Sequence, residues 1–360
     1  MRPDMTYSVY SFIRFSLTVL FCVLIFSMCD EKEQVVVAPL IDGTQLDSWR
    51  IDTLPPQGNP GGLHLFCMLV IDTNHIVVGG HGIGSVIKLI EFKEDSMINW
   101  STSAGVYDLA SAADGFYSCE HFFPGAVTYN LKGNKILYRT DNLDDIAYSI
   151  FRRSEGTYFV GVTRAGIYRF DGSTFKRDTI IARLNGSDRM FFFTDFAEHR
   201  GSNYAIALYY IRDGAEERGY LLKETSSRRW EYIDSCSYAW NESFDRPHFG
   251  TQKLHATKDG ALFSIGAGGA FRMRDDETWE SLVRMELGVG IGGTSSKDMY
   301  FGSNNGHFYY YDGTTVKEIS IPTLSPKTMI AEIVVIGGKI FILTQDWGNN
   351  VSYLLRGERR

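Results

Sequence analysis

The chain has little of what marks several common protein classes. Its 360 residues include 9 prolines and 5 cysteines, and two of these cysteines fall within residues 1–34. The other three, Cys67, Cys119 and Cys236, stand at unrelated spacings, which excludes a disulfide framework and a zinc-ligand pattern. The formal net charge is −7 and basic residues are interspersed with acidic ones, so the electrostatic footprint of a nucleic-acid-binding protein is missing. Catalysis and the binding of a protein or glycan remain as function classes.

Aromatic residues and glycine are abundant. The sequence has 24 Phe, 20 Tyr and 36 Gly, and 44% of its residues are hydrophobic. Such a composition fills a sizeable core, favours strands over helices and supplies many turns. It indicates an all-β protein.

Residues 1–28 have the layout of a signal peptide. Arg2 and Arg14 precede an uncharged apolar run from Phe15 to Met28, shorter than the roughly 20 residues that span a bilayer. The junction FSMC, which ends at Cys29 and is followed by an acidic stretch, resembles the lipobox of bacterial lipoproteins, with Met where Gly or Ala is usual. The resemblance implies a lipid anchor on Cys29, a tether over residues 29–45 and display on the bacterial outer membrane or cell surface. An ordinary cleaved signal with a secreted product, or an uncleaved anchor, is the alternative.

A unit of about 40 residues recurs from Leu65 to the C-terminus. Alternating apolar runs follow turn signals at seven places, which begin at His75, Gly115, Gly156, Asn203, Gly260, Asp298 and Gly338. The intervals between these starts range from 38 to 57 residues. Repeats of this length predict stacked β units that share one continuous core.

The units share an internal order of strands and turns. GTYFVGVTRAGIYRFDGSTFKR and KDMYFGSNNGHFYYYDGTTVKE each contain a strand, a Gly-containing loop, a second strand, a tight turn and a third strand. The Asp-Gly dipeptides at Asp171 and Asp312 predict type I′ hairpins, in which both central residues have positive φ. One more apolar run precedes each unit. Four strands in each unit are typical of a propeller blade.

The last unit ends one strand short, and the segment Ser48–Asp52 near the N-terminus has the pattern of an unpaired strand. We therefore predict that residues 46–360 form an all-β, seven-bladed β-propeller. Its four-stranded antiparallel blades are closed into a ring by the N-terminal strand, which removes the free edge. The units resemble the blades of bacterial secreted and lipoprotein β-propellers and lack the Trp-Asp and sialidase signatures. This resemblance implies an architecture and no particular activity.

The loops between second and third strands, and those between blades, are expected on one face of such a ring. They carry aromatic, His, Arg and amide residues, which give contact area and orientation to a bound partner. The candidate binding residues are His81, His121, Phe123, Arg164, Arg212, Trp240, Arg246, His248, Asn305, His307, Trp347 and Asn349.

Chemistry-bearing patterns are weak elsewhere. His and Cys residues occur in isolated pairs, the glycine-rich segment 79–84 leads to no helix N-terminus, and no nucleophile elbow occurs, so we expect no metal and no cofactor. We expect a monomeric, non-catalytic binding or scaffolding module for a protein or glycan at the cell envelope. The alternative is an extracytoplasmic glycan hydrolase or lyase that uses carboxylates such as Asp195 or Asp346.

Overall fold

The computed structural model describes residues 46–54, 63–82, 87–94, 96–101, 105–120, 126–131, 134–140, 146–163, 166–181, 189–211, 217–226, 228–237, 248–321 and 324–359. They belong to one compact unit, Asp42–Arg360. The predicted signal peptide, Cys29 and the tether lie outside the described residues. In the described part of the chain, no helix has the length and apolar character needed to cross a membrane.

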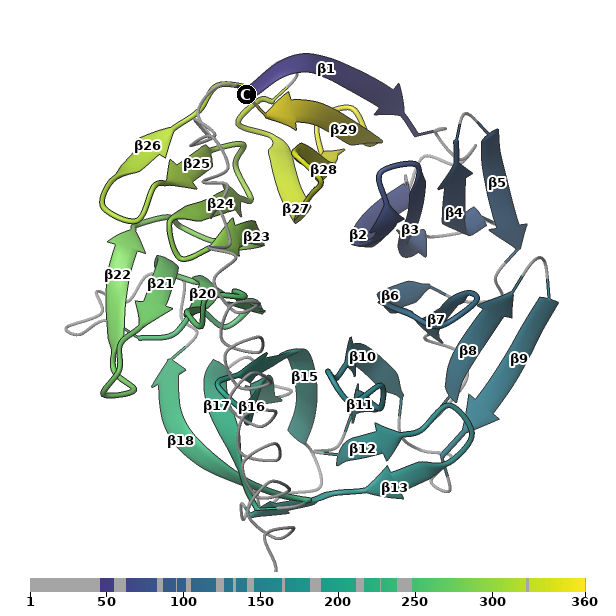
Figure 1. The fold of residues 1–360 in the computed structure, drawn as a ribbon, viewed down its shortest axis with the longest axis vertical. Helices are drawn as coiled ribbons and strands as arrows, with labels where there is room; N and C mark the ends of the chain where they lie inside the picture. The colour runs from purple at the N-terminus through teal and green to yellow at the C-terminus, as the bar shows by residue number, and fades with distance from the viewer. Residues whose placement is uncertain are drawn as a thin grey trace, which may run out of the picture. The chain divides into compact units, whose positions relative to one another are not determined.

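Seven sheets follow one another around a ring, which confirms the predicted seven-bladed propeller (Figure 1). We number the blades in chain order, with β1 in blade 7. Blades 1 to 3 contain β2 (Leu63–Asp72), β3 (His75–Gly82), β4 (Ile87–Lys93) and β5 (Ser96–Ser101); β6 (Val106–Ser111), β7 (Phe116–Glu120), β8 (Ala126–Leu131) and β9 (Asn134–Arg139); and β10 (Ala147–Arg152), β11 (Tyr158–Val162), β12 (Gly166–Phe170) and β13 (Phe175–Arg177).

Blades 4 to 7 complete the ring, and all strands of a blade pair antiparallel except β14. They contain β14 (Thr179–Ile181), β15 (Arg189–His199), β16 (Ser202–Ile211), β17 (Glu217–Ser226) and β18 (Arg229–Ser237); β19 (Lys253–Ala256), β20 (Leu262–Gly266), β21 (Gly269–Met273) and β22 (Trp279–Val283); β23 (Gly288–Ser295), β24 (Asp298–Ser303), β25 (Phe308–Tyr311) and β26 (Val316–Glu318); and β27 (Thr328–Ile336), β28 (Lys339–Asp346), β29 (Val351–Arg359) and β1 (Leu46–Thr53). The short β14 pairs parallel with β18, so blade 4 has five strands where four were predicted.

The ring closes as the sequence predicts. β1 pairs antiparallel with β29, from Leu46 opposite Arg359 to Thr53 opposite Tyr353. Trp49 packs against the core of blade 7, and an added Cβ at Gly357 would lie 2.9 Å from the Cζ3 atom of its ring. A side chain at this position would have to displace the indole or Ile340. The N-terminal strand therefore supplies the outer edge of the last blade.

The core lies between the sheets, because a twisted blade must bury both of its faces. Each hydrophobic cluster draws on neighbouring blades; one of them combines Tyr117 of blade 2 with Tyr158 and Phe170 of blade 3. Tyr117 meets both other rings edge to face, and its centroid lies 4.9 Å from that of Tyr158. The aromatic residues that are abundant in the sequence thus fill the spaces between blades.

The Asp-Gly turns differ from the prediction. Gly172 and Gly313 have φ of 93° and 94°, but Asp171 and Asp312 are not among the residues with positive φ, so the turns are not type I′. The Asp side chain organises each turn instead: Asp171 accepts hydrogen bonds from the backbone N–H groups of Ser173 and Thr174. Four hydrogen bonds to the ionised form lower the pKa of Asp171. The capping aspartate, which the dipeptide rule overlooks, decides the turn geometry.

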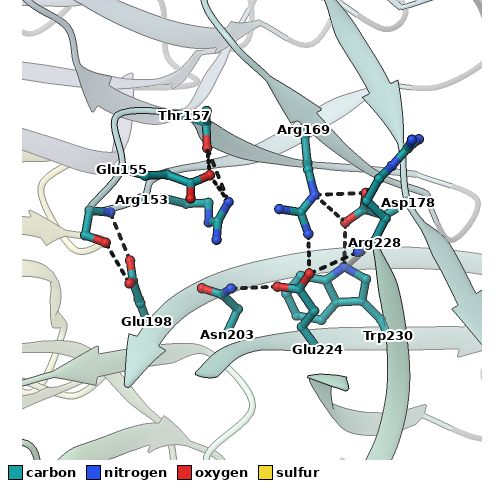
Figure 2. Close-up of polar contacts among 11 residues, drawn as sticks. Arg153, Glu155, Thr157, Arg169, Asp178, Glu198, Asn203, Glu224, Arg228 and Trp230 are labelled. Atoms are coloured by element: carbon teal, nitrogen blue, oxygen red, sulfur yellow. Dashed lines mark hydrogen bonds and ion pairs between the residues drawn. The ribbon is translucent and has the colours of Figure 1, made fainter. Parts of the chain in front are cut away.

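A network of charges joins blade 3 to blade 4 (Figure 2). The carboxylate of Asp178, whose side chain is fully buried, accepts hydrogen bonds from Arg169 Nε at 3.1 Å and from Trp230 Nε1 at 3.0 Å. Arg169 also pairs with Glu224, which accepts a hydrogen bond from Asn203 at 2.6 Å. Each charge has an opposite partner across the junction. Loss of one member should destabilise this junction, because it leaves another buried charge uncompensated.

Candidate functional site

The turn between β28 and β29 presents an aromatic side chain on the predicted binding face. Trp347 is 45% exposed and is the one aromatic residue among the exposed large hydrophobic residues of the described chain. Its backbone N–H donates to the carbonyl of Lys327 at 2.9 Å. Asp346, itself 7% exposed, accepts hydrogen bonds from Gly348 N and from Asn349 Nδ2 at 2.8 and 2.7 Å. A buried carboxylate therefore holds a rigid turn from which the indole projects.

The neighbouring blade carries a second ordered turn on the same face. Asn305 accepts a hydrogen bond from Ser303 Oγ at 2.6 Å, and Ser303 Oγ also accepts from His307 N at 2.9 Å. The His307 ring lies 2.6 Å from a carboxylate oxygen of Glu318 and stacks beside Tyr309. The turn of blade 6 thus carries polar groups and an imidazole ring on the same face as the Trp347 turn of blade 7.

The innermost strands of blades 2, 3 and 4 carry a row of aromatic rings. The rings of Tyr107 and Tyr148 stack with centroids 4.3 Å apart, and Phe192 lies 5.0 Å from Tyr148. All three are partly buried. Loss of solvation raises the pKa of Tyr107 to about 12. The rings occupy the first half of β6, β10 and β15, the end at which the connections between blades enter, and so they lie toward the binding face.

The same part of the inner strands contains a recurring β-bulge. The register shifts once near the start of β2, β6, β10, β15, β23 and β27. Cys67, Asp108, Ser149, Asp195, Gly290 and Glu332 follow these shifts. A bulge turns the next side chain away from the regular alternation. In blades 2, 4 and 7 this residue is Asp108, Asp195 or Glu332, and its side chain reaches another blade.

Two aspartates at this position connect adjacent blades. Asp108 accepts hydrogen bonds at 2.8 Å from Leu109 N and from Ile150 N of blade 3. Asp195 accepts bonds of the same length from Phe196 N and from Leu254 N of blade 5. Both oxygens of each carboxylate thus bind main-chain N–H groups.

Burial dominates the electrostatics of both groups. Desolvation raises the pKa of Asp108 to about 7, and desolvation with the nearby Asp108 charge raises the pKa of Asp195 to about 8, although the backbone N–H groups act in the opposite direction. These carboxylates therefore join blades and titrate near neutral pH.

An ion pair also connects the innermost strands of blades 5 and 7. Lys253 of β19 pairs with Glu332 of β27 and donates to the carbonyl of Ala331 at 2.9 Å. It thereby reaches from blade 5 to blade 7, past the glycine-rich strand β23 of blade 6. Burial lowers the pKa of Lys253, but Glu332, Asp195 and Asp108 outweigh it and leave the pKa above its ordinary value.

The structure places only some of the sequence-predicted site residues. Asn305, His307, Trp347 and Asn349 lie on adjacent turns of blades 6 and 7, and His248 is partly buried just before blade 5. His81 lies within β3 and not in a loop, because the pairing with β2 continues to Leu63 opposite Gly82. His121, Phe123, Arg164, Arg212, Trp240 and Arg246 lie outside the described residues.

The carboxylates considered for hydrolysis have structural partners. Asp195 joins blades 4 and 5, and Asp346 caps the Trp347 turn. The aromatic row and the aspartate connections were not predicted from the sequence, although a signal existed: Tyr107 and Tyr148 lie one repeat interval apart. Among the described residues, no cluster of three or more His, Cys, Asp or Glu side chains could hold a metal ion.

No model of a known protein family matches the chain, and no curated protein matches its sequence. Solved structures match the fold at low identity. Virginiamycin B lyase from Staphylococcus aureus is 13% identical with a TM-score of 0.61, covering 86% of this chain and 99% of the other. YCF48 bound to the D1 peptide is 14% identical with a TM-score of 0.57, covering 86% and 95%. The Dos1 propeller is 10% identical with a TM-score of 0.55, covering 88% and 96%. At these identities the likeness establishes a β-propeller fold and leaves the function open.

Proposed function

We propose that this protein is a binding propeller that captures a polypeptide partner on the face bearing the Trp347 turn. The observation that carries the proposal is the exposed indole of Trp347 on a turn whose backbone is capped by Asp346. Tryptophan is enriched among the residues that dominate interface energies, since it buries a large area at a small cost in conformational entropy. The capping of its turn by Asp346 lowers this cost further, because the backbone is ordered before binding.

The surroundings of Trp347 suit a polypeptide. The turn of blade 6 adds amide and imidazole groups that can bind main-chain amides, and the row of Tyr107, Tyr148 and Phe192 lies toward the same face. One fold neighbour, YCF48, has a structure with a bound peptide, the D1 peptide. Another neighbour is a lyase, but here Asp195 and Asp346 both hold structural hydrogen bonds, which favours binding over carboxylate catalysis.

We further propose that the propeller is displayed at a bacterial cell envelope by a lipid on Cys29. The support is the sequence alone: an apolar run that ends at a cysteine and is followed at once by acidic residues. A single acyl chain holds a protein weakly, so stable anchoring needs more than one chain on the same residue. The tether of residues 29–45 would then present the propeller to its partner.

The partner face can be tested by photo-crosslinking. A photo-reactive phenylalanine analogue is placed at Trp347, or at Ile136 of the outer strand β9 as a control, since Ile136 is 49% exposed. We expect adducts from position 347 only. The affinity of the purified adduct partner for the Trp347→Ala variant should then fall about 30-fold, or about 2 kcal/mol, and be unchanged for Ile136→Ala. Equal crosslinking at both positions, unchanged affinity in Trp347→Ala, or a glycan as the partner would contradict the proposal.

A further inference from the structure

A cleft lies at the end of blade 7 opposite to the Trp347 turn. It has a volume of about 460 Å³ and opens between the ring-closing strands β1, β28 and β29 and the two turns of blade 1 that follow β2 and β4. Trp347 follows the last residue of β28, whereas Lys339, which lines the cleft, is the first. The cleft is therefore separate from the proposed partner face. Its volume is within the range of small-ligand sites.

Charges of both signs line this cleft. Arg50, Lys339 and Arg356 are the basic residues of the lining, and Glu94 and Glu358 are the acidic ones. An anion alone would meet the two carboxylates, and a cation alone would meet three basic groups. The lining is therefore complementary to a ligand that carries a positive and a negative charge.

Asp52 pairs with both arginines of the lining, Arg50 and Arg356. One carboxylate oxygen of Asp52 accepts a hydrogen bond from Arg50 Nε at 3.0 Å. The other oxygen forms an ion pair with Arg356 Nε at 2.8 Å. The guanidinium of Arg356 also lies 5.3 Å from the centroid of the Phe92 ring. Guanidinium groups with a fixed orientation bind carboxylates well, because less side-chain entropy is lost on binding.

The backbone of the cleft is strained at two points. Ser48 and Glu94, which both line it, have φ of 56° and 55°, a region that residues other than glycine rarely adopt. The Glu94 turn is held by a hydrogen bond from its N–H to the carbonyl of Asn74, at 2.7 Å. Strained residues concentrate at ligand sites, where the surrounding structure holds them in place.

From the cavity, the paired charges and the strained backbone, we propose that this cleft binds a short peptide with free amino and carboxyl ends, two or three residues long. Its carboxylate lies against Arg50 and Lys339, and its ammonium group lies against Glu94 and Glu358. Because β1 forms one wall and blade 1 forms another, the ligand touches both sides of the ring closure. Binding therefore stabilises the closed ring by linkage, in proportion to the logarithm of ligand concentration.

The test uses thermal unfolding of the intact protein with a randomised tripeptide pool at millimolar concentration. Matched pools carry an N-terminal acetyl group, a C-terminal amide, or both. We expect the pool with free ends to raise the unfolding temperature and each capped pool to raise it less, with no rise for the doubly capped pool. Arg50→Gln and Lys339→Gln should each weaken the apparent affinity by about tenfold, since each loses one charge contact.

The control variant is Arg229→Gln, because Arg229 is similarly exposed and pairs with Glu231 on blade 4, away from the cleft. It should leave the shift intact, as should Trp347→Ala, which separates this site from the partner face. Absence of a shift with the free pool, an equal shift with the doubly capped pool, or no effect of either cleft variant would overturn the proposal. An N-acetyl pool as effective as the free pool would overturn the zwitterionic ligand.

Discussion

Substitution of Asp195 by Asn tests how side chains of the innermost strands hold neighbouring blades together. The carboxylate binds Phe196 N and Leu254 N, each at 2.8 Å, and so links blade 4 to blade 5. An amide keeps the size of the side chain, but its NH₂ group cannot accept the second N–H. One buried donor is then unsatisfied, and we expect the free energy of unfolding to fall by about 1–3 kcal/mol in mildly acidic solution.

The pH dependence of this loss has a definite sign. In the unfolded chain Asp195 gives up its proton at about pH 4, whereas in the folded protein its pKa is raised to about 8. Between these values the folded state binds one proton more than the unfolded state, so this group contributes stability at low pH that is lost as the pH rises. The slope is about 1.4 kcal/mol per pH unit. Asn does not titrate, so the advantage of wild type over Asp195→Asn should fall with this slope above about pH 5, vanish within about one to two pH units, and become a disadvantage before about pH 8.

Urea unfolding of both proteins across this pH range gives the difference in their free energies of unfolding. The other titrating groups contribute equally to both proteins and cancel in this difference. Asp108→Asn is the matched control, since Asp108 has the same hydrogen-bond arrangement and a pKa raised to about 7. Its difference from wild type should change in the same direction and level off about one pH unit lower. A difference that grows with pH would show that folding favours the ionised carboxylate and that desolvation does not dominate its pKa.

Two further predictions concern the ring closure and the anchor. Gly357→Ala places a Cβ within 3.0 Å of the Trp49 ring and of Ile340, and should lower the free energy of unfolding by about 1–3 kcal/mol; adding Trp49→Phe, which removes the contacting ring atoms, should recover part of this loss, and no recovery would refute the proposed clash. Cells given labelled fatty acid should incorporate it into the wild-type protein and not into Cys29→Ser, and equal labelling would exclude lipidation at Cys29.

The sequence predicted the architecture well because blades are local units. Each of the four strands in a blade pairs with a strand next to it in the chain, so the interval between turn signals is enough to count the blades. The closing strand is the exception, since Trp49 lies far from β29 in the sequence. It could still be predicted because the last unit lacked one strand and an unpaired segment remained. The extra strand β14 could not be predicted, because its three residues pair with β18 of the same blade, from which three strands separate it in the sequence.

The candidate site was less predictable. Trp347 and Asn349 were named from loop position alone, and the structure adds that Asp346 fixes their turn. The turn type at Asp171 was wrong because hydrogen bonds from its side chain compete with the backbone preference of the dipeptide. Asp195 has no distinctive context in the sequence. Its partner Leu254 lies on the next blade, and a local sequence pattern cannot indicate a contact between residues so far apart in the chain.

The sequence by itself determined the all-β class, the seven repeated units and the need for a closing N-terminal strand, since each follows from alternation, turn residues and the interval of the repeat. Only the tertiary structure decided which charges meet. Arg169 with Glu224, Lys253 with Glu332, and Asp52 with Arg356 pair across blades or across the ring closure. The physical reason is that strand periodicity is a property of neighbours along the chain, whereas the energy of a buried charge depends on every group that surrounds it in space.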